Sequence, residues 1–490
     1  MKNSILKFET KKNKYIFDNV SGNIIPYNDV EEYIIDNYCN MDKEEMLTQM
    51  EGKFKKTKDE LKGEYDYIKN LISLGYFYRK EEVKAIDLKE DLYHVPMEQL
   101  ILILTEDCNF RCKYCVYSEQ YPQVKGYSKK VMNFQVAKKA IDDYFVRYNK
   151  KCEYGYRKKP MISFYGGEPL LNFELIKRVV NYCNQCNYDV RYFITTNGSI
   201  MTEEIMECIS ENDFNVTFSV DGNREQHDRN RVFAGGEKTF DIVYKNIAKL
   251  QAYKRKKAIE QSISISCTND MYSDYKKIVK FFVDNHDVFY PFYIIFNKVS
   301  HIDTNYYSFC DKLHEEGIIK ENKGISKTSH DLLLQELINN KLSDKELDVY
   351  RCYFTSLYLM NNRNRGSIGV WAGACLPSNK VAVAPDGNYY LCERVNQKFA
   401  IGNIDTGVNF DRCLDVLNQY LDIINRECKD CNINRLCDKC YMHFIKDENT
   451  LKFDKGNCNT KKKGLPKTLS TLYEVLEENP DVLNKGMFDD

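Results

Sequence analysis

Between residues 100 and 300, apolar runs alternate with helical patterns, and this alternation constrains the fold more than any other feature of the sequence. The six apolar runs are Leu100–Leu104, Met161–Tyr165, Val190–Thr195, Val216–Val220, Ile263–Cys267 and Phe292–Phe296. The helical patterns between them are Val131–Tyr148, Phe173–Cys183, Glu203–Ser210, Phe240–Tyr253 and Tyr275–Val283. Alternating strands and helices form parallel sheets with right-handed crossovers. The sequence therefore predicts an α/β fold whose parallel sheet is covered by helices or closed into a barrel.

Polar and glycine-rich segments follow these runs directly. Three cysteines follow the first run, Gly166-Gly167-Glu168-Pro169 follows the second, and Thr196-Asn197-Gly198 follows the third. Asp221-Gly222 follows the fourth and Thr268-Asn269 the fifth. In folds of this kind the functional groups lie on loops at the carboxyl ends of the strands. We therefore expect a functional site at that face of the sheet.

Cysteine is unusually frequent, with 19 residues in a chain of 490. The N-terminus has no apolar run long enough for a signal peptide, and no stretch approaches the roughly 20 apolar residues of a membrane span. We therefore expect a cytoplasmic protein, where grouped cysteines more often bind metal or iron–sulfur clusters than form disulfides. The formal net charge of −1 argues against a nucleic-acid partner.

One group of cysteines, Cys108, Cys112 and Cys115, forms C-x3-C-x2-C directly after the first strand. Zinc sites usually use C-x2-C pairs and four ligands. Three thiolates on one loop suit a [4Fe–4S] cluster with one open iron, which can bind the amino and carboxylate groups of a small molecule. The triplet predicts such a cluster, and a mixed metal site is the alternative.

The triplet and the segments behind the later strands together resemble the radical S-adenosylmethionine (SAM) family, whose signature is C-x3-C-x2-C after the first barrel strand. The resemblance extends to Ser219-Val220-Asp221-Gly222, followed by His227-Asp228 and Arg231. Singly, the Asn-Gly and Asp-Gly pairs fit ordinary turns. Together they imply a partial (β/α)6 radical SAM barrel over residues 97–300.

The same resemblance implies the SAM contacts. Glycines allow a close backbone approach, and a glutamate can accept from an ammonium group. The implied contacts are Gly166, Gly167 and Glu168 at the methionine amino group, Arg231 at its carboxylate, Asn197 and Ser219 as further hydrogen-bonding residues, and Tyr114 near adenine.

A second group of cysteines lies near the C-terminus, and we place its domain at residues 366–460. Its members are Cys375, Cys392, Cys428, Cys431, Cys437, Cys440 and Cys458. This pattern resembles the SPASM extension of radical SAM enzymes, which carries two auxiliary [4Fe–4S] clusters, although the final pair here is C-x2-C where the family has C-x3-C. A pair of structural zinc sites is the alternative.

By family topology, the extension implies two ligand sets. The distal cluster would take Cys428, Cys431, Cys437 and Cys458, and the cluster nearer the barrel would take Cys375, Cys392 and Cys440. The near cluster lacks a fourth ligand. Either Cys352 supplies it or one iron is open. We expect an open iron, which could bind a substrate thiolate and lower its pKa.

The first 90 residues contain short strands at Leu6–Glu9, Lys14–Phe17 and Tyr76–Arg79, with helical patterns at Val30–Tyr38 and Lys58–Leu74. This order resembles the winged-helix-like domain with which maturases of ribosomally made peptides recognise a leader peptide, as an added strand or in a groove beside it. A structural cap on the barrel is the alternative.

The remaining segments carry weaker signals. The charged stretch Lys80–Glu90 is expected to be a linker, and residues 301–365 a helical bridge. Residues 461–490 are expected to form a C-terminal helix near Leu469–Leu476 and a tail, and we interpret Lys461-Lys462-Lys463 as a solvated run.

Together, these resemblances imply a radical SAM peptide maturase with SAM and three [4Fe–4S] clusters as cofactors. Its partners would be a precursor peptide with a leader and an external one-electron donor such as a flavodoxin or ferredoxin. A 5′-deoxyadenosyl radical would abstract a substrate hydrogen, and a thiolate at the near cluster would form a thioether with the resulting carbon radical. No residue is assigned as a general base. The alternatives are formylglycine formation of the sulfatase-maturase type, carbon–carbon cross-linking, and a non-catalytic multi-cluster electron carrier.

Overall fold

A computed structural model describes residues 2–79, 97–121, 126–299, 304–317, 342–353, 375–395, 397–428, 430–437, 440–445, 449–453 and 455–480, with the single residues 319, 336, 339 and 447. The linker predicted over Lys80–Glu90 lies outside these residues. Within the described part, no helix is long and apolar enough to cross a membrane.

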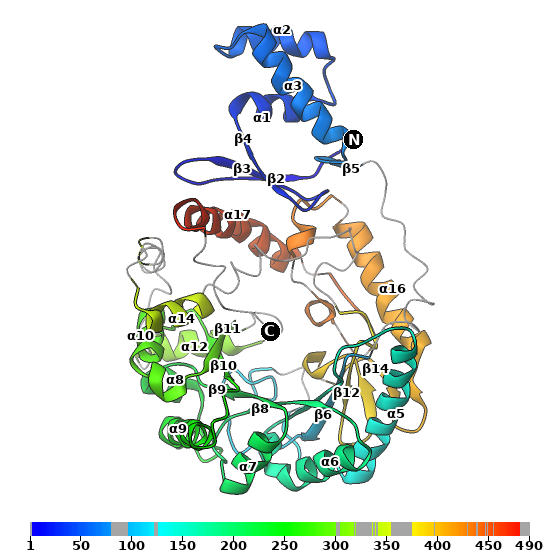
Figure 1. Cartoon of the computed structure of the whole chain (residues 1–490), viewed down its shortest axis with the longest axis vertical. Coiled ribbons are helices and arrows are strands. Elements are labelled where there is room, and N and C mark those ends of the chain that lie inside the picture. Colours follow the sequence, from blue (N-terminus) through cyan, green and yellow to red (C-terminus); the bar gives the residue numbers. More distant parts are fainter. Residues whose placement is uncertain are drawn as a thin grey trace.

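Six parallel strands form the centre of the molecule and confirm the six predicted runs. They are β6 (Gln99–Thr105), β7 (Met161–Gly166), β8 (Arg191–Thr196), β9 (Phe214–Ser219), β10 (Ile263–Asn269) and β11 (Phe292–Lys298). They lie side by side in chain order, and β6 and β11 do not pair with each other. The sheet is therefore an open, partial barrel, with helices on its outer face (Figure 1).

The five predicted helices of this region are also present, with three short helical segments that the sequence pattern did not indicate. The predicted set is α5 (Phe134–Glu153), α6 (Phe173–Gln185), α7 (Glu203–Glu211), α9 (Phe240–Lys256) and α10 (Tyr275–Asp284). The additional segments are η1 (Pro169–Asn172), α8 (Arg224–Asn230) and α11 (His286–Phe289). In the expected bridge, α12 (Tyr306–Glu315) and α14 (Asp344–Tyr353) are described.

The strands present a different chemistry on each face. In β10, Ile263, Ile265 and Cys267 are buried, whereas Ser264 and Ser266 alternate with them and are partly exposed. Because successive side chains point to opposite faces, the apolar residues lie under the outer helices and the hydroxyl groups face the concave side.

The C-terminal extension continues the central sheet to ten strands. β12 (Lys380–Val383) pairs in parallel with β6, and β13 (Asn388–Tyr390), β14 (Ala400–Asn403) and β15 (Gly407–Val408) follow antiparallel. The extension also contains η2 (Glu393–Val395), α16 (Phe410–Glu427), η3 (Asn434–Leu436), η4 (Tyr441–His443) and α17 (Lys455–Glu478). Helix α17 begins well before the predicted Leu469, so the lysine run lies inside a helix instead of in a solvated terminus.

The N-terminal part contains a three-stranded antiparallel sheet and three helices. The elements are β1 (Lys2–Asn3), β2 (Ile5–Glu9), β3 (Lys14–Asp18), β4 (Ile24–Tyr27), α1 (Asp29–Asn37), α2 (Lys43–Lys53), α3 (Lys58–Ser73) and β5 (Tyr78–Arg79). The sheet order is β2-β3-β4, and β1 pairs with β5. The sequence pattern indicated neither β4 nor α2.

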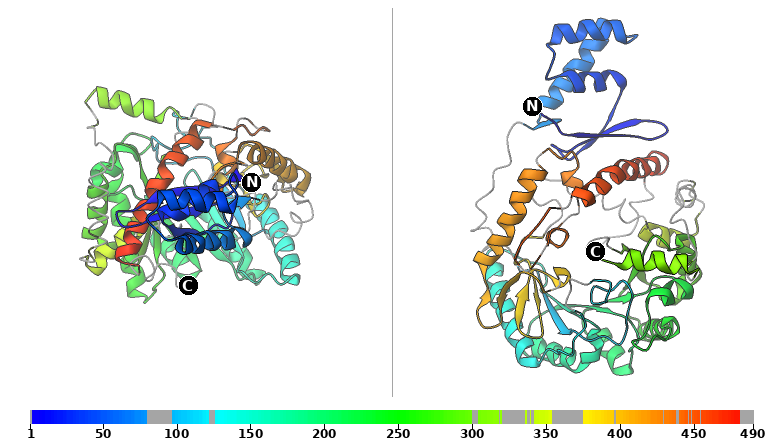
Figure 2. Two further views of the ribbon diagram at one scale, coloured as in Figure 1. Left: turned by 90° about the horizontal axis from the view of Figure 1, so that it is seen from above. Right: turned by 180° about the vertical axis from the view of Figure 1, so that it is seen from behind.

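This N-terminal part is seated on the C-terminal extension. Phe17 of β3 shares a buried cluster with Leu436 and with Leu469 of α17. In Figure 1 and in the right panel of Figure 2, the N-terminal sheet lies next to α17, on the side of this helix that faces away from the barrel.

Candidate functional site

The cysteine triplet lies in the loop after β6, at the carboxyl end of the central sheet. Cys112 is buried, and Cys108 and Cys115 are partly buried. Burial raises the pKa of Cys108 and of Cys112 to about 12. At neutral pH these two thiols would therefore stay protonated by themselves. A bound metal centre would deprotonate them, because metal coordination deprotonates a thiol outright.

The loop after β7 is pressed against the triplet loop. Gly166 has φ 145°, and a Cβ at Gly167 would lie 2.0 Å from the carbonyl oxygen of Asp107. The amide of Glu168 donates to that same carbonyl at 3.0 Å. Any larger residue at position 167 would separate the two loops, so the glycine pair holds Glu168 beside the cysteines.

Glu168 is buried, and burial raises its pKa against the hydrogen bonds that it accepts. Its Oε1 accepts from the Leu170 amide at 3.0 Å and the Thr196 hydroxyl at 2.8 Å, and its Oε2 accepts from the Asn197 amide at 2.7 Å. A carboxylate oxygen can accept two hydrogen bonds, so Oε2 retains a place for one more donor. This arrangement fits the ammonium group predicted at this residue.

Asn197 contacts the triplet loop itself. Its Nδ2 donates to Asn109 Oδ1 at 2.8 Å and lies 3.8 Å from Cys108 Sγ. Its Oδ1 accepts from the amide and the hydroxyl of Ser199. Asn197 therefore stabilises the cysteine loop. Ser219, another predicted SAM contact, is the last residue of β9 and lies partly exposed on the concave face.

Arg231, Tyr114 and Asp221 form a buried chain of hydrogen bonds beside the triplet. Arg231 Nη1 donates to the Tyr114 hydroxyl at 2.8 Å, and that hydroxyl donates to Asp221 Oδ2 at 2.6 Å. Burial raises the pKa of Asp221, and Arg231 opposes this shift. Within the described chain, the buried Nε of Arg231 has no hydrogen-bond partner. An unsatisfied guanidinium donor of this kind fits an incoming carboxylate.

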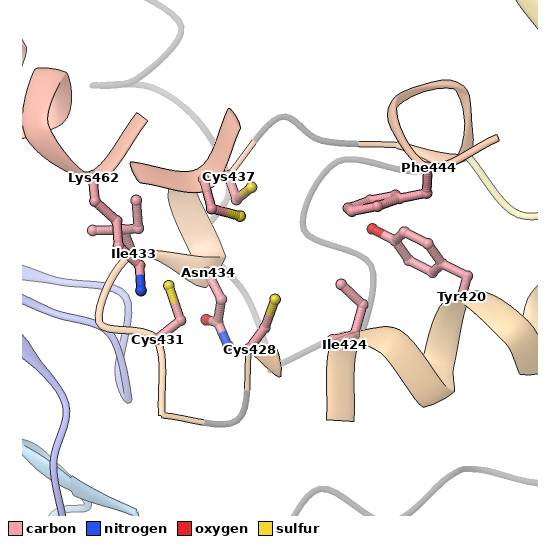
Figure 3. A pocket seen from close by; sticks show the side chains of 10 residues that line it. Tyr420, Ile424, Cys428, Cys431, Ile433, Asn434, Cys437, Phe444 and Lys462 are labelled. Carbon is pink, nitrogen blue, oxygen red and sulfur yellow. The ribbon is translucent and has the colours of Figure 1, made fainter. Parts of the chain in front are cut away.

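Four cysteines line one cavity at the far end of the extension (Figure 3). They are Cys428, Cys431, Cys437 and Cys458. The cavity holds about 40 Å³, and a water needs about 10–15 Å³ by the same measure. Nowhere in the described residues do three His, Cys, Asp or Glu side chains meet closely enough for one metal ion. The four thiols thus surround a space of several atoms, which fits a cluster better than a single zinc.

Lys462 lines the same cavity. It is one turn along α17 from Cys458, at the i, i+4 spacing that puts both side chains on one face. Burial raises the pKa of Cys428 to about 12, and Lys462 opposes that shift. Lys462 is exposed to solvent, as predicted for the lysine run, and it lines the cavity as well.

Cys375 and Cys440 lie near Tyr441, and Cys440 also lies near Cys392. Burial raises the pKa of Tyr441 far above its usual range, with contributions from Tyr420, Cys375 and Cys440. Burial also raises the pKa of Cys392 to about 12, to which Glu393 and Cys440 add. In the described chain the buried Tyr441 hydroxyl has no hydrogen-bond partner. Three thiols and a spare hydroxyl fit the predicted near cluster.

Cys352 lies at the opposite edge of the sheet. It belongs to α14, and its thiol accepts from the Ile294 amide of β11 at 3.4 Å. Cys375 comes just before β12, and five strands separate β11 from β12. Cys352 is thus held against β11, away from the strand that Cys375 precedes.

Glu393 is a candidate functional residue that the sequence reasoning missed. It directly follows Cys392, and its carboxylate is 22% exposed and 3.7 Å from Arg394 Nε. Burial raises the pKa of Tyr165 on β7, and Glu393, Tyr117 and Cys115 add to the shift. Glu393 and Cys115 therefore both lie near Tyr165. Its position next to a grouped cysteine was the available signal.

The geometry agrees with comparisons to known proteins. Residues 102–282 match the model of the Radical SAM superfamily. The chain is 33% identical over 189 residues to the Uncharacterized protein MJ0907 of Methanocaldococcus jannaschii, an alignment that covers 38% of this chain and 59% of that protein. It is 25% identical over 354 residues to the Cysteine-type anaerobic sulfatase-maturating enzyme of Clostridium novyi, covering 70% of this chain and 86% of that enzyme.

A solved structure shares the fold. It is "Native anSMEcpe with bound AdoMet and Cp18Cys peptide", with a TM-score of 0.53 and 22% identity, covering 79% of this chain and 98% of that one. The chain therefore carries a radical SAM domain with a SPASM-type extension. It is a radical SAM enzyme, and its class of cofactor is SAM together with an iron–sulfur cluster.

Proposed function

We propose that this enzyme is a peptide maturase that installs thioether cross-links in a ribosomally made precursor peptide. The observation that carries the proposal is the near trio, where Cys375, Cys392 and Cys440 supply three thiols and Cys352 is remote. A fourth iron without a protein ligand could bind a substrate cysteine.

The SAM site in this proposal is built from residues at the carboxyl ends of β6 to β9. Glu168 Oε2 would accept from the amino group, and Arg231 Nε would donate to the carboxylate. When bound, SAM and its cluster on Cys108, Cys112 and Cys115 supply an organic radical that abstracts a hydrogen atom from the substrate. The buried Arg231–Tyr114–Asp221 chain would hold SAM in register with that cluster.

Thioether formation removes two hydrogen atoms from the peptide, one from carbon and one from sulfur. The carbon hydrogen leaves as an atom to the SAM-derived radical. Glu393 would accept the proton of the thiol. The one surplus electron would leave to an external acceptor, and the cysteines of the extension would support this by holding the auxiliary clusters. Lys462 at the four-cysteine cavity would favour an added electron there, because a nearby positive charge stabilises the reduced cluster.

The N-terminal domain supports a peptide substrate with a leader. β4 pairs with β3 on one side, and its other side is a sheet edge to which a peptide could add as a strand. Two hydrogen bonds link the ends of β4 to α3. Asn23 before β4 donates to the Tyr76 hydroxyl just beyond α3, and Asn28 after β4 donates to Glu64 within it. Tyr67 of α3 is 46% exposed and would offer a bound peptide an apolar contact.

The test is a reaction of the anaerobically reconstituted enzyme with SAM, dithionite and a precursor peptide that carries its leader. The expected product has lost two hydrogen atoms and one free thiol for each cross-link, and tandem mass spectrometry locates the bridge. Absence of 5′-deoxyadenosine formation would instead indicate a non-catalytic electron carrier.

A second candidate reaction is the oxidation of a cysteine or serine to formylglycine. The alignment to the sulfatase-maturating enzyme of Clostridium novyi covers 86% of that enzyme, which favours this reaction. The carboxylate of Glu393 near Tyr165 also favours it, because it could accept a proton from the substrate. Its product is an aldehyde that reacts with hydrazide reagents, whereas a thioether does not. Reaction of a leaderless sulfatase-type peptide as fast as the precursor would support this candidate and contradict the first.

A further inference from the structure

Asn19 of the N-terminal domain reaches across to the turn that carries the distal cysteines. Its side chain is fully buried, and its Nδ2 donates to the carbonyl oxygen of Cys431 at 3.0 Å. Its Oδ1 accepts from the amide of Arg435 at 3.1 Å. One side chain thus bonds to the backbone on both sides of Asn434, which lines the four-cysteine cavity.

Other hydrogen bonds reinforce this attachment from the opposite direction. Arg435 donates through Nε to the carbonyl of Asn19 at 2.9 Å and through Nη2 to the carbonyl of Val20. Asn432 Nδ2 donates to the carbonyl of Ile5 at 3.0 Å. The segment from Cys428 to Cys437 supplies three of the four thiols of the cavity, so its conformation sets where they point.

The contact also has an apolar part. Phe17 is fully buried, and it lies in one cluster with Cys431 and Leu436 of the turn. Leu465 and Leu469 of α17, the helix that carries the fourth cysteine, complete that cluster. The N-terminal sheet therefore forms one wall around the ligand-bearing turn.

We propose that Asn19 is a positioning residue for the distal auxiliary cluster, so that docking of the N-terminal domain and loading of that cluster stabilise each other. The inference rests on the proposed cluster at Cys428, Cys431, Cys437 and Cys458. The coupling is reciprocal by thermodynamic necessity. Whatever the N-terminal domain contributes to cluster retention, the cluster contributes equally to docking.

The turn between β3 and β4 offers a matched control. Asn23 lies four residues from Asn19, and its Nδ2 donates at 3.0 Å to the Tyr76 hydroxyl of its own domain. Asn19→Ala removes both side-chain bonds to the cluster turn. Asn23→Ala removes a hydrogen bond of the same kind that does not involve the extension.

The experiment measures iron release from the reconstituted full-length protein to a chromogenic chelator. The distal phase is the one that disappears in Cys458→Ala. Asn19→Ala should accelerate that phase about tenfold, as expected for the loss of two hydrogen bonds of ordinary strength. Asn23→Ala should release iron like the unmodified protein.

Two further measurements guard against a misfolded domain. Arg435→Gln, which leaves the N-terminal domain unchanged in sequence, should accelerate the same phase. In Cys458→Ala, the amide of Arg435, which donates to Asn19 across the contact, should exchange its hydrogen about tenfold faster, which reports looser docking. Equal rates in Asn19→Ala and Asn23→Ala would overturn the positioning role alone. If Cys458→Ala removes no phase, there is no distal cluster, and the proposed cluster and this inference both fall.

Discussion

Replacement of Arg231 by alanine is expected to weaken SAM binding about ten- to a hundredfold. The side chain is 6% exposed, its Nη1 is held at 2.8 Å by the Tyr114 hydroxyl, and its buried Nε has no partner in the described chain. We expect that Nε to meet the SAM carboxylate. A hydrogen bond to a charged group contributes about 1.5–3 kcal/mol, and each 1.4 kcal/mol is about tenfold in Kd.

The assay is anaerobic equilibrium dialysis with radiolabelled SAM on the reconstituted protein. Arg231→Lys should lose less, about tenfold, because lysine keeps the charge but not the planar fork of donors. Arg224→Ala is the matched control, since Arg224 begins the short helix α8, which Arg231 directly follows, and pairs with Asp241 at the exposed surface. It should bind SAM normally.

The iron content of each variant shows whether a loss of SAM affinity is due to the missing side chain or to the loss of a cluster. All three variants should retain the full iron complement, because none of these arginines is a proposed ligand. If Arg231→Ala keeps its iron and binds SAM with unchanged affinity, the carboxylate lies elsewhere and the orientation proposed for SAM is wrong.

Four further predictions concern the other parts of the site. The protein should hold about twelve iron atoms, and replacing Cys108, Cys112 and Cys115 by alanine should leave about eight on this cluster assignment; stoichiometric zinc would contradict it. Cys352→Ala should retain all clusters and the precursor-dependent change in the cluster spectrum, as should the control Cys413→Ala in the buried core of α16; loss of one cluster in Cys352→Ala would identify Cys352 as a fourth ligand. Glu393→Gln should slow product formation about a hundredfold or more while SAM cleavage continues, as expected for loss of a proton acceptor, and an unchanged rate in the peptide assay would remove that role. Tyr67→Glu should weaken precursor binding about tenfold in fluorescence anisotropy without loss of iron, and equal binding would place the leader elsewhere.

The central sheet could be predicted because its strands carry a strong local signal. In β6, the residues from Leu100 to Thr105 are all buried, so burial on both faces produced a continuous apolar run. Helix α8 has no such signal. Its seven residues are polar and depend on an Asn223 cap and on the buried pair of Arg229 with Asp270, contacts that no local pattern reveals.

The cysteine groups also show that local sequence patterns do not reveal tertiary contacts. The resemblance to the SPASM extension implied that Cys428, Cys431, Cys437 and Cys458 form one set, and the structure brings these four to a single cavity. Spacing left Cys352 as an alternative ligand for the near trio because it precedes Cys375 in the chain. The order of the strands separates the two, and strand order is a property of the whole sheet. Likewise, the lysine run gives no sign in the sequence that Lys462 lies near the cysteines. Only its helical register places Lys462 on the same face of α17 as Cys458.

The seat of the N-terminal sheet on the extension has a consequence for how a peptide would be handled. A leader added to β4 would be anchored at a fixed distance from the distal cysteine turn, because buried contacts such as that of Phe17 with Cys431 hold the N-terminal sheet on the extension. An extended chain advances about 3.3–3.6 Å per residue. The enzyme would then act as a molecular ruler, choosing its target by the number of residues that separate it from the leader. Lengthening that spacer by a few residues would move the modification to a different position along the peptide.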